Sequence, residues 1–61
     1  PIMITKRIEN ITSEDYPWVM GNLAKDFTIE SQTVDSITAT GSEEMWNLTS
    51  FPTTVTFTTL E

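Results

Sequence analysis

The side chains of this chain that could do chemistry are almost all carboxylates. The sequence contains no His and no Cys, so a Ser-His or Cys-His nucleophilic pair is excluded and the usual ligands of a structural zinc ion are missing. The glycines, Gly21 and Gly41, are isolated, which excludes a glycine-rich phosphate loop. The residue types therefore favour binding over catalysis, and we expect no enzyme activity, no cofactor and no metal site.

Two pairs of adjacent acids, Glu14-Asp15 and Glu43-Glu44, are the remaining candidates for acid–base or metal chemistry. Each pair follows a hydroxyl side chain and precedes an apolar stretch, which is the pattern of a helix start. Acids there stabilise the positive end of the helix dipole. We interpret both pairs as structural, and we expect Glu14 and Asp15 also to belong to an acidic binding surface.

The first residues allow one catalytic alternative. A chain of 61 residues that begins Pro1-Ile2 and continues into an alternating strand resembles the small tautomerase family. The resemblance implies that the free amine of Pro1 acts as a general base. The chain departs from that family because its first helix contains Pro17 and Gly21, and because Arg7 is its only arginine, whereas the family binds substrate carboxylates with several.

Trp18 is the strongest candidate for recognition. At about 100° per residue, the helix expected to begin near Ser13 places an apolar stripe on one side and Trp18 on the other. A solvent-facing Trp is a favoured interface anchor, although Trp18 packed over the edge of the core is an equal alternative. Trp46, in contrast, is expected in the core, because little else in the short second helix can cover the sheet. The predicted contact surface consists of Trp18, Gly21, Asn22 and Lys25, with Glu14 and Asp15 beside it.

The charge balance restricts the partners. Nine acids against three basic residues give a net charge of -6, which argues against binding to nucleic acids or to anionic membranes and favours a protein partner with a basic surface. No apolar run is long enough for a membrane span or a signal peptide. With no Cys, we expect a cytoplasmic protein. Small acidic chains of this kind are typical of phage-encoded inhibitors of host enzymes.

The elements that must position these residues follow the order β-α-β-β-α-β. We expect strands at 2–9 and 53–60, a hairpin over 28–40 with a three-residue loop at 34–36, and a short second helix after Gly41-Ser42 that Phe51-Pro52 ends. This order predicts an α+β fold of the ferredoxin-like, split-βαβ type. It has a four-stranded, mostly antiparallel sheet with both helices on one face.

The faces of these elements follow from their periodicity. The stripe of the first helix that we expect to be buried consists of Tyr16, Val19, Met20, Leu23, Ala24 and Phe27. The open sheet face is expected to draw on Thr5, Arg7, Thr28, Glu30, Gln32, Thr38, Thr40, Thr54, Thr56 and Thr58. Because none of these is aromatic, the RNA binding of many domains with this plan is not expected here.

The whole chain, 1–61, is predicted to be one small acidic domain, with Leu60-Glu61 resembling the scar of an affinity tag. Our preferred hypothesis is a non-catalytic protein that inhibits or modulates a larger protein, such as a host enzyme that processes nucleic acids. The alternatives are the Pro1 tautomerase and a structural subunit that forms a homodimer through the Thr-rich edge strand at 53–60.

Overall fold

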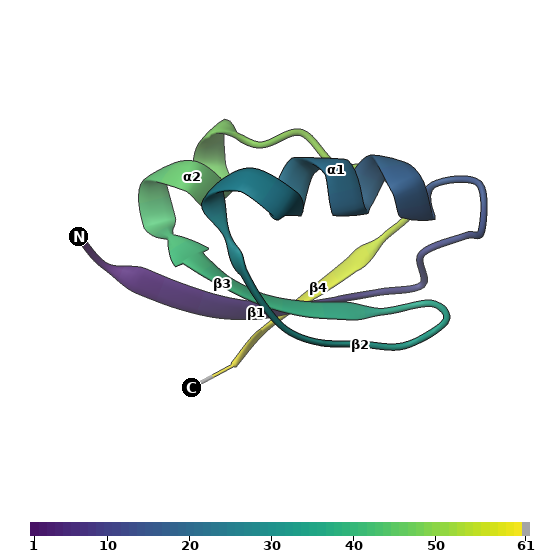
Figure 1. Cartoon of the computed structure of the whole chain (residues 1–61), viewed down its shortest axis with the longest axis horizontal. Coiled ribbons are helices and arrows are strands. Elements are labelled where there is room, and N and C mark those ends of the chain that lie inside the picture. Colours follow the sequence, from purple (N-terminus) through teal and green to yellow (C-terminus); the bar gives the residue numbers. More distant parts are fainter. Residues whose placement is uncertain (61) are drawn as a thin grey trace.

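The computed structural model describes residues 1–60, which form one α+β domain (Figure 1). Its elements are β1 (Met3–Glu9), α1 (Tyr16–Asp26), β2 (Thr28–Gln32), β3 (Ile37–Ser42), α2 (Glu43–Leu48) and β4 (Thr56–Leu60). This is the predicted order. Leu60 ends β4 opposite Thr5, whereas Glu61, the other half of the suspected tag scar, lies outside the described residues.

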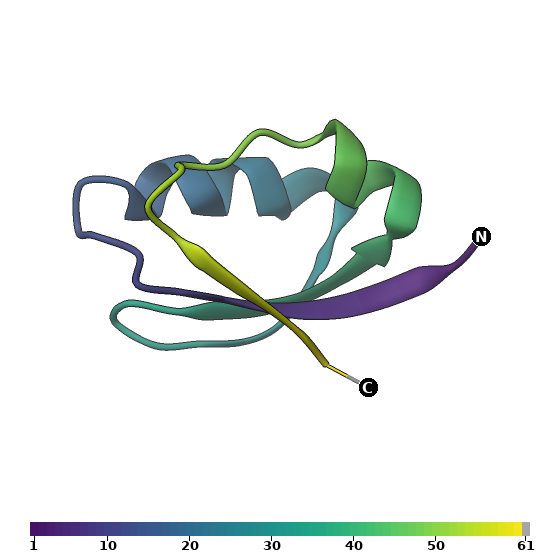
Figure 2. The same ribbon diagram turned by 180° about the vertical axis from the view of Figure 1, so that it is seen from behind.

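The four strands form one sheet in the order β2-β3-β1-β4, in which every neighbouring pair is antiparallel. β1 and β3 are therefore central, and β2 and β4 are the two edges. Figures 1 and 2 show both helices on the same side of the sheet. The predicted α+β class, the four-stranded sheet and the two helices are confirmed.

The core lies between this face of the sheet and the helices. Its buried side chains are Ile8, Ile11, Val19, Leu23, Phe27, Ile37, Ala39 and Trp46. They are all apolar, and among residues 1–60 no polar or charged residue is fully buried. Removal of apolar surface from water is therefore the main force that holds the sheet and the helices together.

Helix α1 begins later than the sequence indicates. Residues 13–15 form a turn in which the Thr12 hydroxyl accepts a hydrogen bond from the Asp15 amide at 3.1 Å, and the helix starts at Tyr16. Pro17 lies in its first turn, where the missing N–H costs little. Glu14 and Asp15 thus precede α1 and do not lie within its first turn.

The predicted stripe of α1 is correct except at Ala24. Val19, Leu23 and Phe27 are buried, and Tyr16 and Met20 are half-buried. Ala24 is exposed, because its direction lies at the margin of the stripe and its small side chain gains little from burial. The spacing therefore predicted the buried face but not its width.

The hairpin differs from the three-residue loop that we expected. Gln32 rather than Thr33 pairs with Ile37, so four residues connect β2 to β3. The longer connection alone would turn Ile29 to the open face of the sheet, away from the helices. A β-bulge between Ile29 and Ser31 adds one residue to β2, so that Ile29 again lies opposite Ala39 on the core side. Gln32, expected on the open face, instead shares the side of Ile37.

Strand β4 begins at Thr56, three residues later than predicted. Its last partner on β1 is Glu9. The next residue, Asn10, adopts a positive φ of 62° and turns β1 away from β4. Residues 53–55 therefore have no strand beside them and form a turn, in spite of the β propensity of Thr and Val. Thr54 consequently lies outside the sheet.

The open face of the sheet is rich in Thr, as predicted. The hydroxyls of Thr5 and Thr40 are hydrogen-bonded at 2.7 Å, and the Thr40 hydroxyl donates to a Glu30 carboxylate oxygen at 3.0 Å. These contacts join β1, β3 and β2 through side chains. Within residues 1–60, no helix has the length and apolar character needed to cross a membrane.

Candidate functional site

The outer surface of α1 carries the contact residues predicted from the sequence. Trp18 is 48% exposed, and Gly21 and Lys25 are exposed one and two turns further along the same side of the helix. Val19 and Leu23, on the other side, are fully buried at 0%. Residues other than Trp18 thus pack α1 against the sheet. Trp18 is an exposed residue of α1 and not a member of the core.

Gly21 leaves an open position beside Trp18. A Cβ atom placed on Gly21 would meet no atom within 4 Å outside its own helix. Glycine is therefore not required here by the packing of the free protein, although it weakens a helix by about 1 kcal/mol relative to Ala. What Gly21 does provide is an accessible stretch of helix backbone.

The other predicted contact residues have mixed environments. Asn22 is half-buried, and its side-chain amide donates to the Ser50 carbonyl at 2.6 Å, so it ties α1 to the segment that follows α2. Glu14 is exposed and Asp15 is half-buried in the turn that leads into α1. The structure therefore brings Trp18, Gly21 and Lys25 together as a surface, with Asn22 serving a structural contact at its margin.

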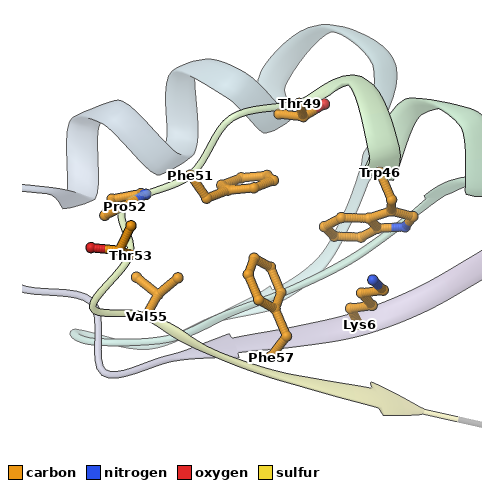
Figure 3. Close-up of a pocket in the computed structure, with 8 residues that line it drawn as sticks. All are labelled: Lys6, Trp46, Thr49, Phe51, Pro52, Thr53, Val55 and Phe57. Atoms are coloured by element: carbon orange, nitrogen blue, oxygen red, sulfur yellow. The ribbon is translucent and has the colours of Figure 1, made fainter.

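A second site, which the sequence analysis did not identify, is a pocket beside α2 (Figure 3). Its volume is about 440 Å³. Its walls come from β1, α2, β4 and the segment between α2 and β4. The residues that line it are Lys6, Trp46, Thr49, Phe51, Pro52, Thr53, Val55 and Phe57.

Three aromatic rings form most of this pocket. The centroid of Phe51 lies 6.0 Å from that of Trp46 and 5.4 Å from that of Phe57, and the Trp46–Phe57 distance is 6.3 Å. Trp46 is held in place because its indole N–H donates to the Ile4 carbonyl at 3.0 Å and its ring packs edge-on against Phe27 at 4.6 Å. As predicted, Trp46 is a core residue, only 7% exposed.

Within the part of the chain that the structure describes, Lys6 is the one charged residue in the pocket lining. Its ammonium nitrogen lies 5.2 Å from the Trp46 ring centroid and 5.5 Å from that of Phe57, which is the geometry of a cation–π contact. Figure 3 shows its side chain pointing from β1 towards the face of Trp46. The signal in the sequence was that Lys6 interrupts the apolar positions Ile4 and Ile8 on the core-facing side of β1.

The residues of the tautomerase resemblance are not brought together. Pro1 is exposed before β1, and Arg7 is exposed further along the chain. The strand from Met3 to Arg7 alone spans about 13 Å at 3.3 Å per residue, and Pro1 precedes it. Neither lines the pocket. Within residues 1–60, no three acidic side chains gather in a way that could hold a metal ion.

Comparison of the chain with known proteins finds no significant match. No family model matches the chain, and neither a curated protein nor a solved structure is significantly similar to it. The two sites, the surface of α1 around Trp18 and the aromatic pocket with Lys6, are therefore interpreted from their own geometry and chemistry.

Proposed function

We propose that this chain is a small non-catalytic domain that binds a larger protein with a basic surface and modulates it, and that the outer surface of α1 makes the contact. The observation that carries the proposal is the 48% exposure of Trp18 on a helix whose opposite side forms the core. Exposing an indole to water is unfavourable, and Trp is among the residues that contribute most to protein–protein affinity.

The neighbours of Trp18 support a protein partner over a small ligand. Trp18 is not among the residues that line the pocket, and Gly21 allows a partner to approach the backbone of α1. Lys25 ends the surface, while Glu14 and Asp15 lie before its beginning. A partner would thus meet an apolar anchor between charged residues, which is the usual arrangement of an interface core and its rim.

The charge of the whole chain supports a basic partner. A net charge of -6 steers the domain towards positively charged surfaces and away from nucleic acids and anionic membranes. Enzymes that process nucleic acids carry such surfaces. A small acidic inhibitor of a host enzyme, of the kind that phages encode, is the function that fits this chemistry best.

We also propose that the arrangement of elements is the ferredoxin-like split-βαβ plan. In support, β3 lies between β1 and β2, and β1 lies between β3 and β4. Each helix therefore connects two strands that have one antiparallel strand between them, which is the defining feature of a split βαβ unit. In this plan the outer surfaces of the helices remain free for a partner.

The test is a comparison of Trp18→Ala with the wild type. A binding partner is first captured from a host lysate with wild-type protein and identified, and its affinity is then measured for both proteins by calorimetry. We expect Trp18→Ala to weaken binding by about 2 kcal/mol or more, which is a loss of roughly thirtyfold. A thermal melt should show that its free energy of unfolding stays within about 1 kcal/mol of the wild-type value.

Trp46→Ala is the matched control, because it removes the same side chain from the core. It should cost about 3–5 kcal/mol, enough to unfold so small a domain. If Trp18→Ala were to unfold the domain as Trp46→Ala does, Trp18 would be a core residue and the proposed surface would lose its anchor. An unchanged affinity for the captured partner would likewise contradict the proposal.

A second candidate function, a homodimeric subunit, is favoured by the difference between the two sheet edges. The β2 edge is interrupted by a bulge and carries Glu30, and both features discourage pairing with another strand. The β4 edge, Thr56–Leu60, has no charged residue, no Pro and no bulge in its pairing with β1. Such an edge is open to pairing with β4 of a second copy.

A further inference from the structure

We propose that the aromatic pocket binds a monocarboxylate attached to an apolar body, and that the Lys6 ammonium is its counter-ion. This site is separate from the α1 surface, so the inference does not rest on the proposed function.

The shape and lining of the pocket suit an apolar group. Its volume of about 440 Å³ lies within the range of about 300–1,000 Å³ that is common for small-ligand sites. Trp46, Phe51 and Phe57 present ring faces and edges to the cavity, and Val55 lies beside them (Figure 3). Phe57 is 42% exposed in the free protein, so a ligand that covered its ring would remove apolar surface from water.

The charge of Lys6 calls for an anion. Among residues 1–60 no acidic residue lines the pocket, and the strand partners of Lys6 are Ala39 and Thr59. Lys6 is half-buried as a residue, and its ammonium group lies over two rings, which stabilise the charge less than a carboxylate would. A carboxylate placed at the Lys6 end of the pocket would accept a charge-assisted hydrogen bond from the ammonium group, in a partly desolvated site.

The net charge limits the ligand to a single negative charge. A molecule of charge -6 repels anions, and it repels a phosphate dianion about twice as strongly as a carboxylate. One cation in the pocket can compensate one charge. The apolar body must therefore supply most of the affinity, and the carboxylate supplies orientation and selectivity.

This ligand chemistry has two sources, a free small acid and the carboxyl terminus of a peptide whose last side chain is apolar. Two matched pairs of probes distinguish them. The first pair is 3-phenylpropionate and its neutral amide. The second pair is a pentapeptide that ends in Phe, with either a free carboxylate or an amidated terminus. Each acid and its amide share the apolar body and differ only in the charge.

The measurement is an NMR titration of the wild-type protein at constant pH and ionic strength. We expect the acid of at least one pair to shift the indole N–H resonance of Trp46 and the amides of Phe51 and Phe57. It should bind about tenfold more tightly than its amide, as a charge-assisted hydrogen bond predicts. Tighter binding of 3-phenylpropionate than of the pentapeptide acid would identify the ligand as a small acid. Tighter binding of the pentapeptide acid would identify it as the carboxyl terminus of a peptide.

Lys6→Met tests the counter-ion directly, because it keeps most of the length of the unbranched side chain and removes the charge. It should abolish the preference for acid over amide. Arg7→Met is the matched control, since it lowers the net charge by the same amount from the opposite face of β1 and should leave that preference unchanged. Equal affinity of acid and amide in the wild type, equal effects of the two variants, or no shift of Trp46 with any probe would overturn the proposal.

Discussion

At the scale of the residue, the same side-chain type serves opposite purposes in different places. Trp46 is 7% exposed, with its indole N–H bonded to the Ile4 carbonyl, whereas Trp18 is 48% exposed on the outside of α1. Lys6, a charged residue at a core-facing position, lines the aromatic pocket beside Trp46. The environment of each residue, and not its type, therefore separates a packed Trp from an exposed one.

The two glycines show the same contrast and provide a prediction. Gly21→Ala should stabilise the free protein by up to about 1 kcal/mol, because Ala is a better helix former and its methyl group meets no other atom. Gly41→Ala should destabilise it by about 1–3 kcal/mol. A Cβ at Gly41 would overlap the ring of Phe27, which is buried in the core and packs edge-on against Trp46.

Urea unfolding of the two glycine variants measures both effects. For a domain of this size, 1 kcal/mol corresponds to about 4–8 °C in melting temperature, so a thermal melt also resolves them. Similar effects of the two substitutions would contradict this account. Where a partner is known, Gly21→Ala should in addition weaken its binding, since the new methyl group stands in the proposed contact.

At the scale of the element, α2 depends on its first residues. It has only six residues, Glu43–Leu48, yet it carries Trp46 into the core and forms one wall of the pocket. The Ser42 hydroxyl accepts a hydrogen bond from the Met45 amide at 3.1 Å, which caps the helix as the sequence indicated. The acids Glu43 and Glu44 lie in its first turn, where they stabilise the helix dipole.

Ser42→Ala should therefore cost about 1 kcal/mol of stability, the usual value for the loss of such a cap. Ser13→Ala is the control, since Ser13 lies in the turn before α1 and the N-cap position of that helix, Asp15, makes no side-chain cap. We expect Ser13→Ala to stay within about 0.5 kcal/mol of the wild type in a thermal melt. A larger loss at Ser13 than at Ser42 would show that the caps are assigned wrongly.

At the scale of the whole molecule, the net charge distinguishes the two candidate functions. Binding to a basic partner should weaken as salt rises, because screening removes attraction. Self-association of a chain of charge -6 should strengthen with salt, because screening removes repulsion. The sign of the salt dependence therefore separates a partner-binding domain from a homodimer.

If β4 pairs with a second copy, sedimentation velocity should show a dimer fraction that rises with concentration and with salt. Thr58→Lys, at the centre of the β4 edge, should abolish it, because an edge lysine opposes strand pairing. Ser13→Lys changes the net charge equally at an exposed position outside the sheet and should leave the dimer fraction nearly unchanged. A monomer at every concentration and salt would remove the homodimer as a function.

The sequence by itself determined the order of the elements, the α+β class and the buried side of α1, whereas it left the exposure of Trp18 open. These follow from local periodicity and from the separation of apolar and polar residues, which every strand or helix of this kind must obey. It also determined the absence of His and Cys, because that is a matter of composition.

Only the tertiary structure decided the features that depend on which strands meet. The bulge in β2 arises because Ile29 and Ile37 must face the same helices through a four-residue connection. The late start of β4 follows from the turn at Asn10, which deprives residues 53–55 of a partner strand. The pocket joins Lys6 to side chains about 40 to 50 residues away in the chain, and no local pattern specifies a contact between segments so far apart, because only the packing of β1, α2 and β4 against one another creates it.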